Sequence, residues 1–186
     1  MPAVNKSIDL LHIQNKHHPA VSVLQNIYEA AFPAAERREF SQLLTLLHQP
    51  DMFLYMIVSA KEVTGLCIYW QLEGFCFLEH LAIVPSHQKH GLGKHVMLWL
   101  LTRSSRKLVL EVERPVDEIS KRRIRFYQDL HGFTLHNTFD YHQPPYQKGG
   151  QSVPLYLMSA EPIADAAELV QVASHIKQQV YERFHQ

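Results

Sequence analysis

The stretch LAIVPSHQKHGLGKHVMLWLL, residues 81–101, changes its pattern halfway along. It begins with apolar residues typical of a buried strand, and its second half has the composition of a helix. Between the two parts, Gly91 and Gly93 occupy what should be the first turn of that helix. Glycine costs a helix about 1 kcal/mol relative to alanine. Because glycine lacks a Cβ, the pair predicts that another group approaches the backbone closely here.

An anion is the group that this position favours, since the first N–H groups of a helix are unpaired and the helix dipole is positive there. Two common phosphate motifs nevertheless do not fit. A Walker A loop requires glycine where Gln88 stands and serine or threonine where His95 stands. A dinucleotide fingerprint requires glycine in place of Val96. An ordinary glycine-rich turn remains the alternative.

The rest of the chain predicts a mixed α/β fold. Strands rich in β-branched and aromatic residues are predicted at 7–13, 52–60, 63–72, 75–84, 107–113, 133–141 and 153–159. Helices are predicted at 19–32, 34–49, 91–104, 117–130 and 161–186. This order is not the strict alternation of a doubly wound sheet. We expect one domain over residues 1–160, followed by an amphipathic helix over 161–186 that packs on the domain or on a partner subunit.

Composition excludes several classes of function. The 186 residues are 46% hydrophobic and carry 18 basic and 18 acidic side chains, so the formal net charge is zero. A balanced charge argues against binding to nucleic acid or to a membrane surface. With two cysteines and neither a leader pattern nor an apolar run of membrane-spanning length, a cytoplasmic location is expected. The 13 histidines lack metal-site spacing, so no metal is expected.

Two motifs together resemble the GCN5-related N-acetyltransferase (GNAT) family. The segment LAIVPSHQKHGLG, residues 81–93, is similar to the family's acetyl-CoA motif, and FYQDLHGF, residues 126–133, is similar to its aromatic–tyrosine landmark. The resemblance extends over about residues 7–159. It implies a central, mostly antiparallel twisted sheet of about seven strands, flanked by helices. In that fold the parallel strands 75–84 and 107–113 splay apart.

The resemblance also implies acetyl-CoA as the cosubstrate and CoA as a product. The pyrophosphate would lie on the glycine turn, and the pantetheine would pair with the backbone of the preceding strand. The residues that match these positions are Leu81, Ala82, Ile83, Gln88, Lys89, His90, Gly91, Leu92, Gly93 and Lys94. One departure concerns the other wall of the site, because Ser120 stands where members often carry an asparagine.

For catalysis, the resemblance assigns Tyr127 as the acid that assists the departing CoA thiolate. The base is expected to be Glu79 first and Glu111 second. A glutamate within an apolar strand is costly to bury unless it has a partner or a task. His80 follows Glu79 directly, so the alternation of a strand predicts that the two side chains face opposite sides of the sheet.

The acceptor is expected to be a primary amine of a small molecule or a peptide, acetylated by direct attack in a ternary complex. Tyr141 and Tyr146 would form an aromatic wall beside its carbon skeleton. Two alternatives stay open, a non-catalytic acyl-CoA sensor and an acyltransferase for a longer acyl group. A homodimer is possible because the helix over 161–186 has an apolar stripe.

Overall fold

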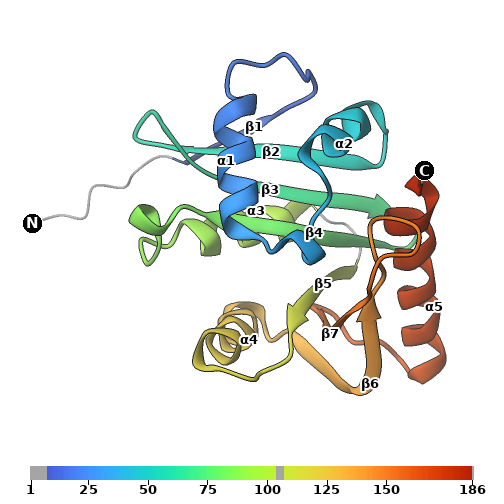
Figure 1. The fold of residues 1–186 in the computed structure, drawn as a ribbon. Coiled ribbons are helices and arrows are strands. Elements are labelled where there is room, and N and C mark those ends of the chain that lie inside the picture. The colour runs from blue at the N-terminus through green and yellow to red at the C-terminus, as the bar shows by residue number, and fades with distance from the viewer. Residues whose placement is uncertain (1–7, 104–106, 186) are drawn as a thin grey trace, which may run out of the picture.

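A computed structural model describes residues 8–103 and 107–185 of the chain. The described residues form a seven-stranded sheet in the order β1-β2-β3-β4-β5-β7-β6 (Figure 1). The strands are β1 (Ile8–His12), β2 (Met52–Ser59), β3 (Glu62–Leu72), β4 (Phe75–Ile83), β5 (Lys107–Glu113), β6 (Thr134–Gln143) and β7 (Val153–Ser159). Only β4 and β5 pair in parallel; the other neighbours are antiparallel. The mixed α/β fold and its mostly antiparallel sheet are therefore confirmed.

The helices are α1 (Val21–Ala31), α2 (Phe40–Thr45), α3 (Leu92–Arg103), α4 (Glu118–His131) and α5 (Ala166–Ile176). Single helical turns are η1 (Ala34–Glu36), η2 (Leu46–His48), η3 (Pro85–His87), η4 (Lys177–Tyr181) and η5 (Glu182–Phe184). Residues of α1, α2 and α5 share one core cluster with the sheet, while α3 and α4 contribute to the other. The expected ends of the first strand, at residue 7, of the third helix, at residue 104, and of the last helix, at residue 186, lie outside the described residues.

The parallel pair separates halfway along its length. Register partners run only from Phe75 opposite Lys107 to Leu78 opposite Leu110. Beyond Leu78, β4 continues beside β3, while β5 continues beside β7. The sheet thus opens at its centre, as the family resemblance implies, and the residues that follow Leu78 and Leu110 border the opening.

A bulge in β4 contradicts the expectation for Glu79 and His80. Opposite β4, Ile68 pairs with His80 and Tyr69 pairs with Leu78, which leaves Glu79 without a register partner. An extra residue in one strand interrupts the alternation of side chains. Both Glu79 and His80 therefore lie on the face covered by α1, and both come within reach of the Tyr146 hydroxyl.

The helix expected over 34–49 is wrong, since this segment forms η1, α2 and η2 with a break at residues 37–39. Arg37 is extended, and Glu39 also has a non-helical backbone, with a ψ of 132°. Between them Arg38 is only 2% exposed, and its backbone N–H donates to the Tyr28 hydroxyl at 3.0 Å. Buried contacts of Arg38 thus override a local helical preference.

The C-terminal segment packs on the sheet of its own chain. Its helix begins at Ala166 rather than at 161, and the Asp165 side chain caps it by accepting from the N–H of Glu168. After α5 the chain continues as the π-helical turn η4. Val180 and Tyr181 of this turn are fully buried in the core cluster that contains α1.

Candidate active site

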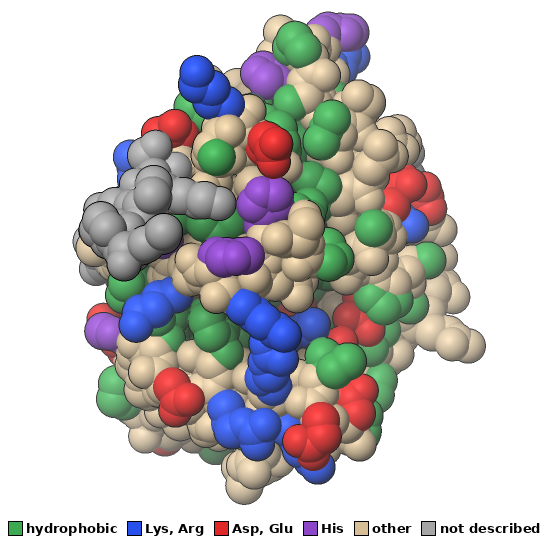
Figure 2. Space-filling view, turned by 90° about the vertical axis from the view of Figure 1, so that its left-hand side faces the viewer, with side chains coloured by type: hydrophobic (Ala, Val, Ile, Leu, Met, Phe, Trp, Pro, Cys, Tyr) green, Lys and Arg blue, Asp and Glu red, His purple; other side chains and the backbone are tan. Residues whose placement is uncertain are grey.

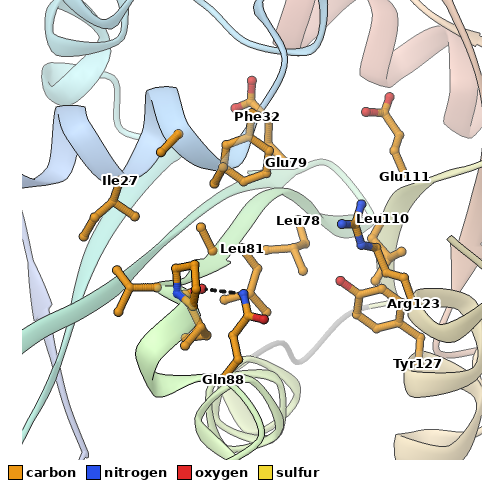
Figure 3. Close-up of a pocket in the computed structure, with 16 residues that line it drawn as sticks. Ile27, Phe32, Leu78, Glu79, Leu81, Gln88, Leu110, Glu111, Arg123 and Tyr127 are labelled. Carbon is orange, nitrogen blue, oxygen red and sulfur yellow. Dashed lines mark hydrogen bonds between the residues drawn. The ribbon is translucent and has the colours of Figure 1, made fainter. Parts of the chain in front are cut away.

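A cavity of about 370 Å³ lies where β4 and β5 separate (Figure 3). Its floor comes from the diverging strands and includes Leu78 and Leu110, and α1 supplies an apolar wall that ends at Phe32. Three residues with ionisable side chains, Glu111, Arg123 and Tyr127, complete the lining on the side of β5 and α4. The cavity therefore has an apolar wall on one side and ionisable side chains on the other.

Glu111 is half-buried and lines this cavity. The Tyr141 hydroxyl donates to its Oε1, and the Tyr181 hydroxyl donates to its Oε2 at 2.8 Å. Burial raises the pKa of Glu111 to about 7, although the two phenol hydrogen bonds favour the ionised form and oppose this rise. A carboxyl group with a pKa near neutrality exchanges protons readily at physiological pH. Glu111 thus has the properties of a general base.

Glu79 is enclosed more completely, since its side chain has no exposed surface. The Trp70 Nε1–H donates to Oε2 at 2.6 Å, and the Tyr146 hydroxyl donates to Oε1 at 2.9 Å. The Arg38 Nε lies 3.5 Å from Oε1. The backbone of Glu79 borders the cavity, but its carboxylate is occupied by these three groups.

His80 belongs to the same buried group. Its Nε2 lies 3.3 Å from the Tyr28 hydroxyl and 3.4 Å from the Tyr146 hydroxyl. Burial lowers the pKa of His80 to about 4, so the imidazole is neutral at pH 7. Both phenols contact the same nitrogen, so Nε2 either accepts from one of them or donates to them, depending on which ring nitrogen carries the proton.

Tyr127 lies on α4, with its buried ring packed against Phe126 and Phe133. Figure 3 shows its hydroxyl pointing into the cavity. Among the described residues this hydroxyl has no hydrogen-bond partner. Burial raises the pKa of Tyr127 to about 12, so the phenol keeps its proton at neutral pH. It can therefore donate a hydrogen bond to a group placed in the cavity.

The glycine turn borders a second and larger cavity of about 910 Å³. It shares five lining residues with the first: Leu81, Ile83, Gln88, Arg123 and Tyr127. Gly91 has a φ of +80°, a backbone conformation that favours glycine whatever binds nearby. Gly93 is different: a Cβ built there would meet no neighbour closer than 3.8 Å. The packing of the protein does not require glycine at position 93, so the free space there is available to a ligand.

Cationic side chains gather around this second cavity, on the face where α3 begins and α4 lies (Figure 2). Lys89 and Lys94 are among them, as the sequence predicts, whereas His90 does not line either cavity. Sequence reasoning missed Arg122, Arg123 and Arg125 of α4. The spacing of the arginines on an exposed helix resembles an ordinary solvated face, and only the packing of α4 beside α3 reveals their common cavity.

The other residues predicted to bind acetyl-CoA divide between the two cavities. Leu92, Gly91 and Gly93 line the larger one, and Ala82 lines the smaller one. The Gln88 side chain folds back, so that its Nε2 donates to the carbonyl of Ile83 at 2.9 Å. This bond ties the turn to the end of β4.

Tyr141 and Tyr146, expected to form an aromatic wall beside the acceptor, lie outside the cavity between β4 and β5. Both rings are buried in the core, and their hydroxyls donate to Glu111 and Glu79 respectively. The apolar wall of that cavity comes instead from Ile27, Ala30 and Ala31 of α1 and from Phe32, which follows the helix.

The cysteines do not take part in either cavity. Cys67 and Cys76 are free and buried in the sheet. Burial raises the pKa of Cys67 to about 12, which leaves almost no thiolate at neutral pH. Within the described residues there is no cluster of three metal-binding side chains, and no helix is long and apolar enough to cross a membrane.

A family model and a similar solved structure indicate the same family. The model of the acetyltransferase (GNAT) family matches residues 21–133. A structure from Bacteroides thetaiotaomicron assigned to the same family is 32% identical, with a TM-score of 0.83, and the match covers 93% of this chain and 98% of the other. No curated protein matches the sequence.

Two more distant structures share the fold. NAA60 from Arabidopsis thaliana in complex with acetyl-CoA is 20% identical, with a TM-score of 0.63, over 82% of this chain and 97% of the other. The ribosomal-protein-S18-alanine N-acetyltransferase from Escherichia coli is 17% identical, with a TM-score of 0.56, over 86% and 98%.

Proposed function

Because the chain belongs to the GNAT acetyltransferase family, we propose that it transfers the acetyl group of acetyl-CoA to a primary amine by direct attack, releasing CoA. The observation that carries this proposal is the cavity between β4 and β5, which Glu111 and Tyr127 line and which shares Gln88 and Tyr127 with the larger cavity at the glycine turn. One catalytic domain over residues 1–160, with the segment 161–186 packed on it, would perform the reaction. We also propose a cytoplasmic location.

The residues around the larger cavity fit acetyl-CoA. An anionic pyrophosphate suits the unpaired N–H groups at the start of α3 and the neighbouring Lys89 and Lys94. Gly93 leaves room for close approach to the backbone. In the described chain, β4 has no strand neighbour on its β5 side beyond Leu78, so Leu81 and Ile83 can pair with the amides of pantetheine. Bound acetyl-CoA supplies a thioester with an electrophilic carbonyl carbon.

Glu111 would prepare the amine for attack. A lysine-like amine has a pKa of about 10.4 and is mostly protonated at pH 7, so it must lose a proton before or during attack. Glu111, with a pKa of about 7, can accept that proton in the cavity. We assign the base to Glu111 rather than to Glu79, because the Glu79 side chain has no exposed surface and lies against the Arg38 guanidinium, whereas Glu111 is half-buried.

Tyr127 would assist the departing sulfur. Its phenol is protonated at neutral pH, has no partner among the described residues and points into the cavity. A hydrogen bond from this hydroxyl would stabilise the developing thiolate.

The first test is calorimetric titration of the protein with acetyl-CoA, beside CoA, ATP and NAD, followed by an amine panel with several acyl-CoA donors. We expect micromolar binding of acetyl-CoA and CoA, and acetylation of at least one amine class. Binding without turnover on any amine would favour an acyl-CoA sensor. Faster turnover with a longer acyl-CoA would mean that the protein is an acyltransferase for a longer acyl group. No binding to a folded protein would refute the proposal.

The change Gly93→Ala should separate ligand binding from folding. An alanine Cβ has room in the protein and a better helix propensity, so the melting temperature should stay equal or rise. The same Cβ occupies the space proposed for pyrophosphate, so the Kd for acetyl-CoA should rise about tenfold. The control is His95→Ala, which alters an exposed residue of the same helix that lines neither cavity. Unchanged affinity in Gly93→Ala would place the pyrophosphate elsewhere.

A further inference from the structure

The C-terminal segment reaches the proposed catalytic site through one unusual turn. After α5 the backbone widens into the π-helical turn η4, which ends at the fully buried Tyr181. Single π-helical turns are rare and frequently occur at functional sites. Two contacts of this turn point to such a role.

The first contact is made by Tyr181 itself. Its hydroxyl donates to the Glu111 Oε2 at 2.8 Å, while Tyr141 donates to the other oxygen of the same carboxylate. Because the two donors come from η4 and β6, they hold the carboxylate from two independent elements. The plane of the Glu111 carboxylate is thereby fixed at the edge of the cavity.

The second contact joins the same turn to the buried Glu79. The Val180 carbonyl accepts a hydrogen bond from the Arg38 guanidinium, whose Nε lies 3.5 Å from Glu79. The Tyr181 ring also packs on the Tyr146 ring, with centroids 4.9 Å apart. One turn of the C-terminal segment therefore contacts the supports of both acidic residues.

We propose that Tyr181 is a positioning residue of the acetyl transfer: with Tyr141 it orients the Glu111 carboxylate and keeps it ionised enough to accept a proton near neutral pH. The C-terminal segment is then part of the active site, not only a cover of the core. This inference rests on the proposed function, in which Glu111 is the base.

The surroundings of Glu111 support this role. Burial raises its pKa, and the nearby carboxylates of Glu79 and Glu36 raise it further. The groups that oppose this rise are the phenols of Tyr141 and Tyr181, and Arg123 lines the same cavity. The pKa of Tyr181 is raised well above 10, so its hydroxyl stays protonated and remains a donor across the physiological range.

The test is the pH dependence of kcat/KM for Tyr181→Phe, which removes the hydroxyl and keeps the ring. Loss of one hydrogen-bond donor should raise the pKa of Glu111 by about one unit. The acidic limb of the pH profile of kcat/KM should therefore shift to higher pH by the same amount. Near pH 7 the activity should fall about fivefold and should recover by pH 9, because the ionised fraction of Glu111 recovers. The titration of the acceptor amine is common to both proteins and cancels in their ratio.

Two further variants complete the design. Tyr141→Phe removes the other donor and should shift the limb in the same direction. Tyr156→Phe is the matched control, because this tyrosine packs against the opposite core cluster and should leave the profile unchanged. An equal loss of activity at every pH in Tyr181→Phe, or no loss at all, would overturn the proposed role.

A measurement without substrate separates this inference from the proposed function. The Glu111 carboxyl carbon, labelled with ¹³C, can be titrated by NMR in the resting wild type and in Tyr181→Phe, with Glu111→Gln to assign the signal. If the wild type acetylates amines but Glu111 has the same pKa in the wild type and in Tyr181→Phe, the role of Tyr181 is refuted and the proposed function stands. If the pKa rises in the variant but no amine is acetylated, the proposed function fails, and with it the catalytic meaning of the shift.

Discussion

Glu111→Gln should lower kcat/KM for amine acetylation about 10³-fold, within the range of 10²–10⁴ typical of general acid–base catalysis. The amide has nearly the shape of the carboxylate and can still accept from Tyr181, but it cannot take a proton from the amine. The acidic limb of the pH profile should disappear as well, because the group with the pKa of about 7 is gone. Calorimetry should show an unchanged Kd for acetyl-CoA.

The same substitution should stabilise the fold at neutral and alkaline pH. The folded pKa of Glu111 lies near 7, above its ordinary value of 4.5, so the folded state binds more protons than the unfolded state between these values. Stability of the wild type therefore falls as pH rises from 4.5 to about 7. Glutamine carries no charge, so the melting temperature of Glu111→Gln relative to wild type should increase over this window and then level off.

Glu79→Gln is the matched control because it changes a second glutamate that borders the same cavity. An amide cannot serve both the Trp70 N–H and the Arg38 guanidinium as a carboxylate does, so this variant should lose stability. Its remaining folded fraction should keep the acidic limb of the pH profile. If Glu79→Gln abolished turnover in folded protein while Glu111→Gln retained it, our assignment of the base would be reversed.

The sequence predicts the glycine turn well because this feature is local, whereas the separation of β4 and β5 is expected only from the family resemblance. A strand, a proline, two glycines and a helix follow one another within residues 81–101, and the boundary of β5 falls where the apolar pattern places it. The positive φ of Gly91 and the free space at Gly93 account for the two glycines separately. Local pattern is sufficient here, since no distant residue is needed to define the turn.

The bulge at Glu79 could not be predicted in the same way. Strict alternation places Glu79 and His80 on opposite faces, whereas the missing register partner brings both to one face. A bulge depends on how β3 and β4 align over their full length, and no residue type marks it. The choice between Glu79 and Glu111 as base depends on this detail, because the bulge directs the Glu79 carboxylate into the core.

Long-range contacts explain the other differences between the site expected from the sequence and the site in the structure. Tyr141 and Tyr181 lie 30 and 70 residues from Glu111 in the sequence, yet both donate to it. A tyrosine in an apolar pattern gives no sign of where its hydroxyl will bind. Arg38 likewise interrupts a segment with helical composition, because its buried contacts reach Val180 and Glu79.

Tyr127→Phe should lower kcat about 10²-fold and leave the Kd for acetyl-CoA unchanged. The effect should be smaller than that of Glu111→Gln, because a thiolate can leave without being protonated first. A phenol with a pKa of about 12 is also too weak an acid to transfer its proton fully, so it contributes mainly a hydrogen bond to the developing charge. Steady-state kinetics at saturating acetyl-CoA measures this loss.

The fold should tolerate this change, since no described residue is hydrogen-bonded to the Tyr127 hydroxyl and phenylalanine fills the same space between Phe126 and Phe133. Tyr55→Phe is the control, because Tyr55 belongs to the same core cluster but lines neither cavity. A pKa of about 12 also predicts that wild type and Tyr127→Phe keep the same ratio of kcat from pH 6 to pH 10. A ratio that changed with pH in this range would mean that the phenol ionises during turnover, and Tyr127 would then act as a base instead.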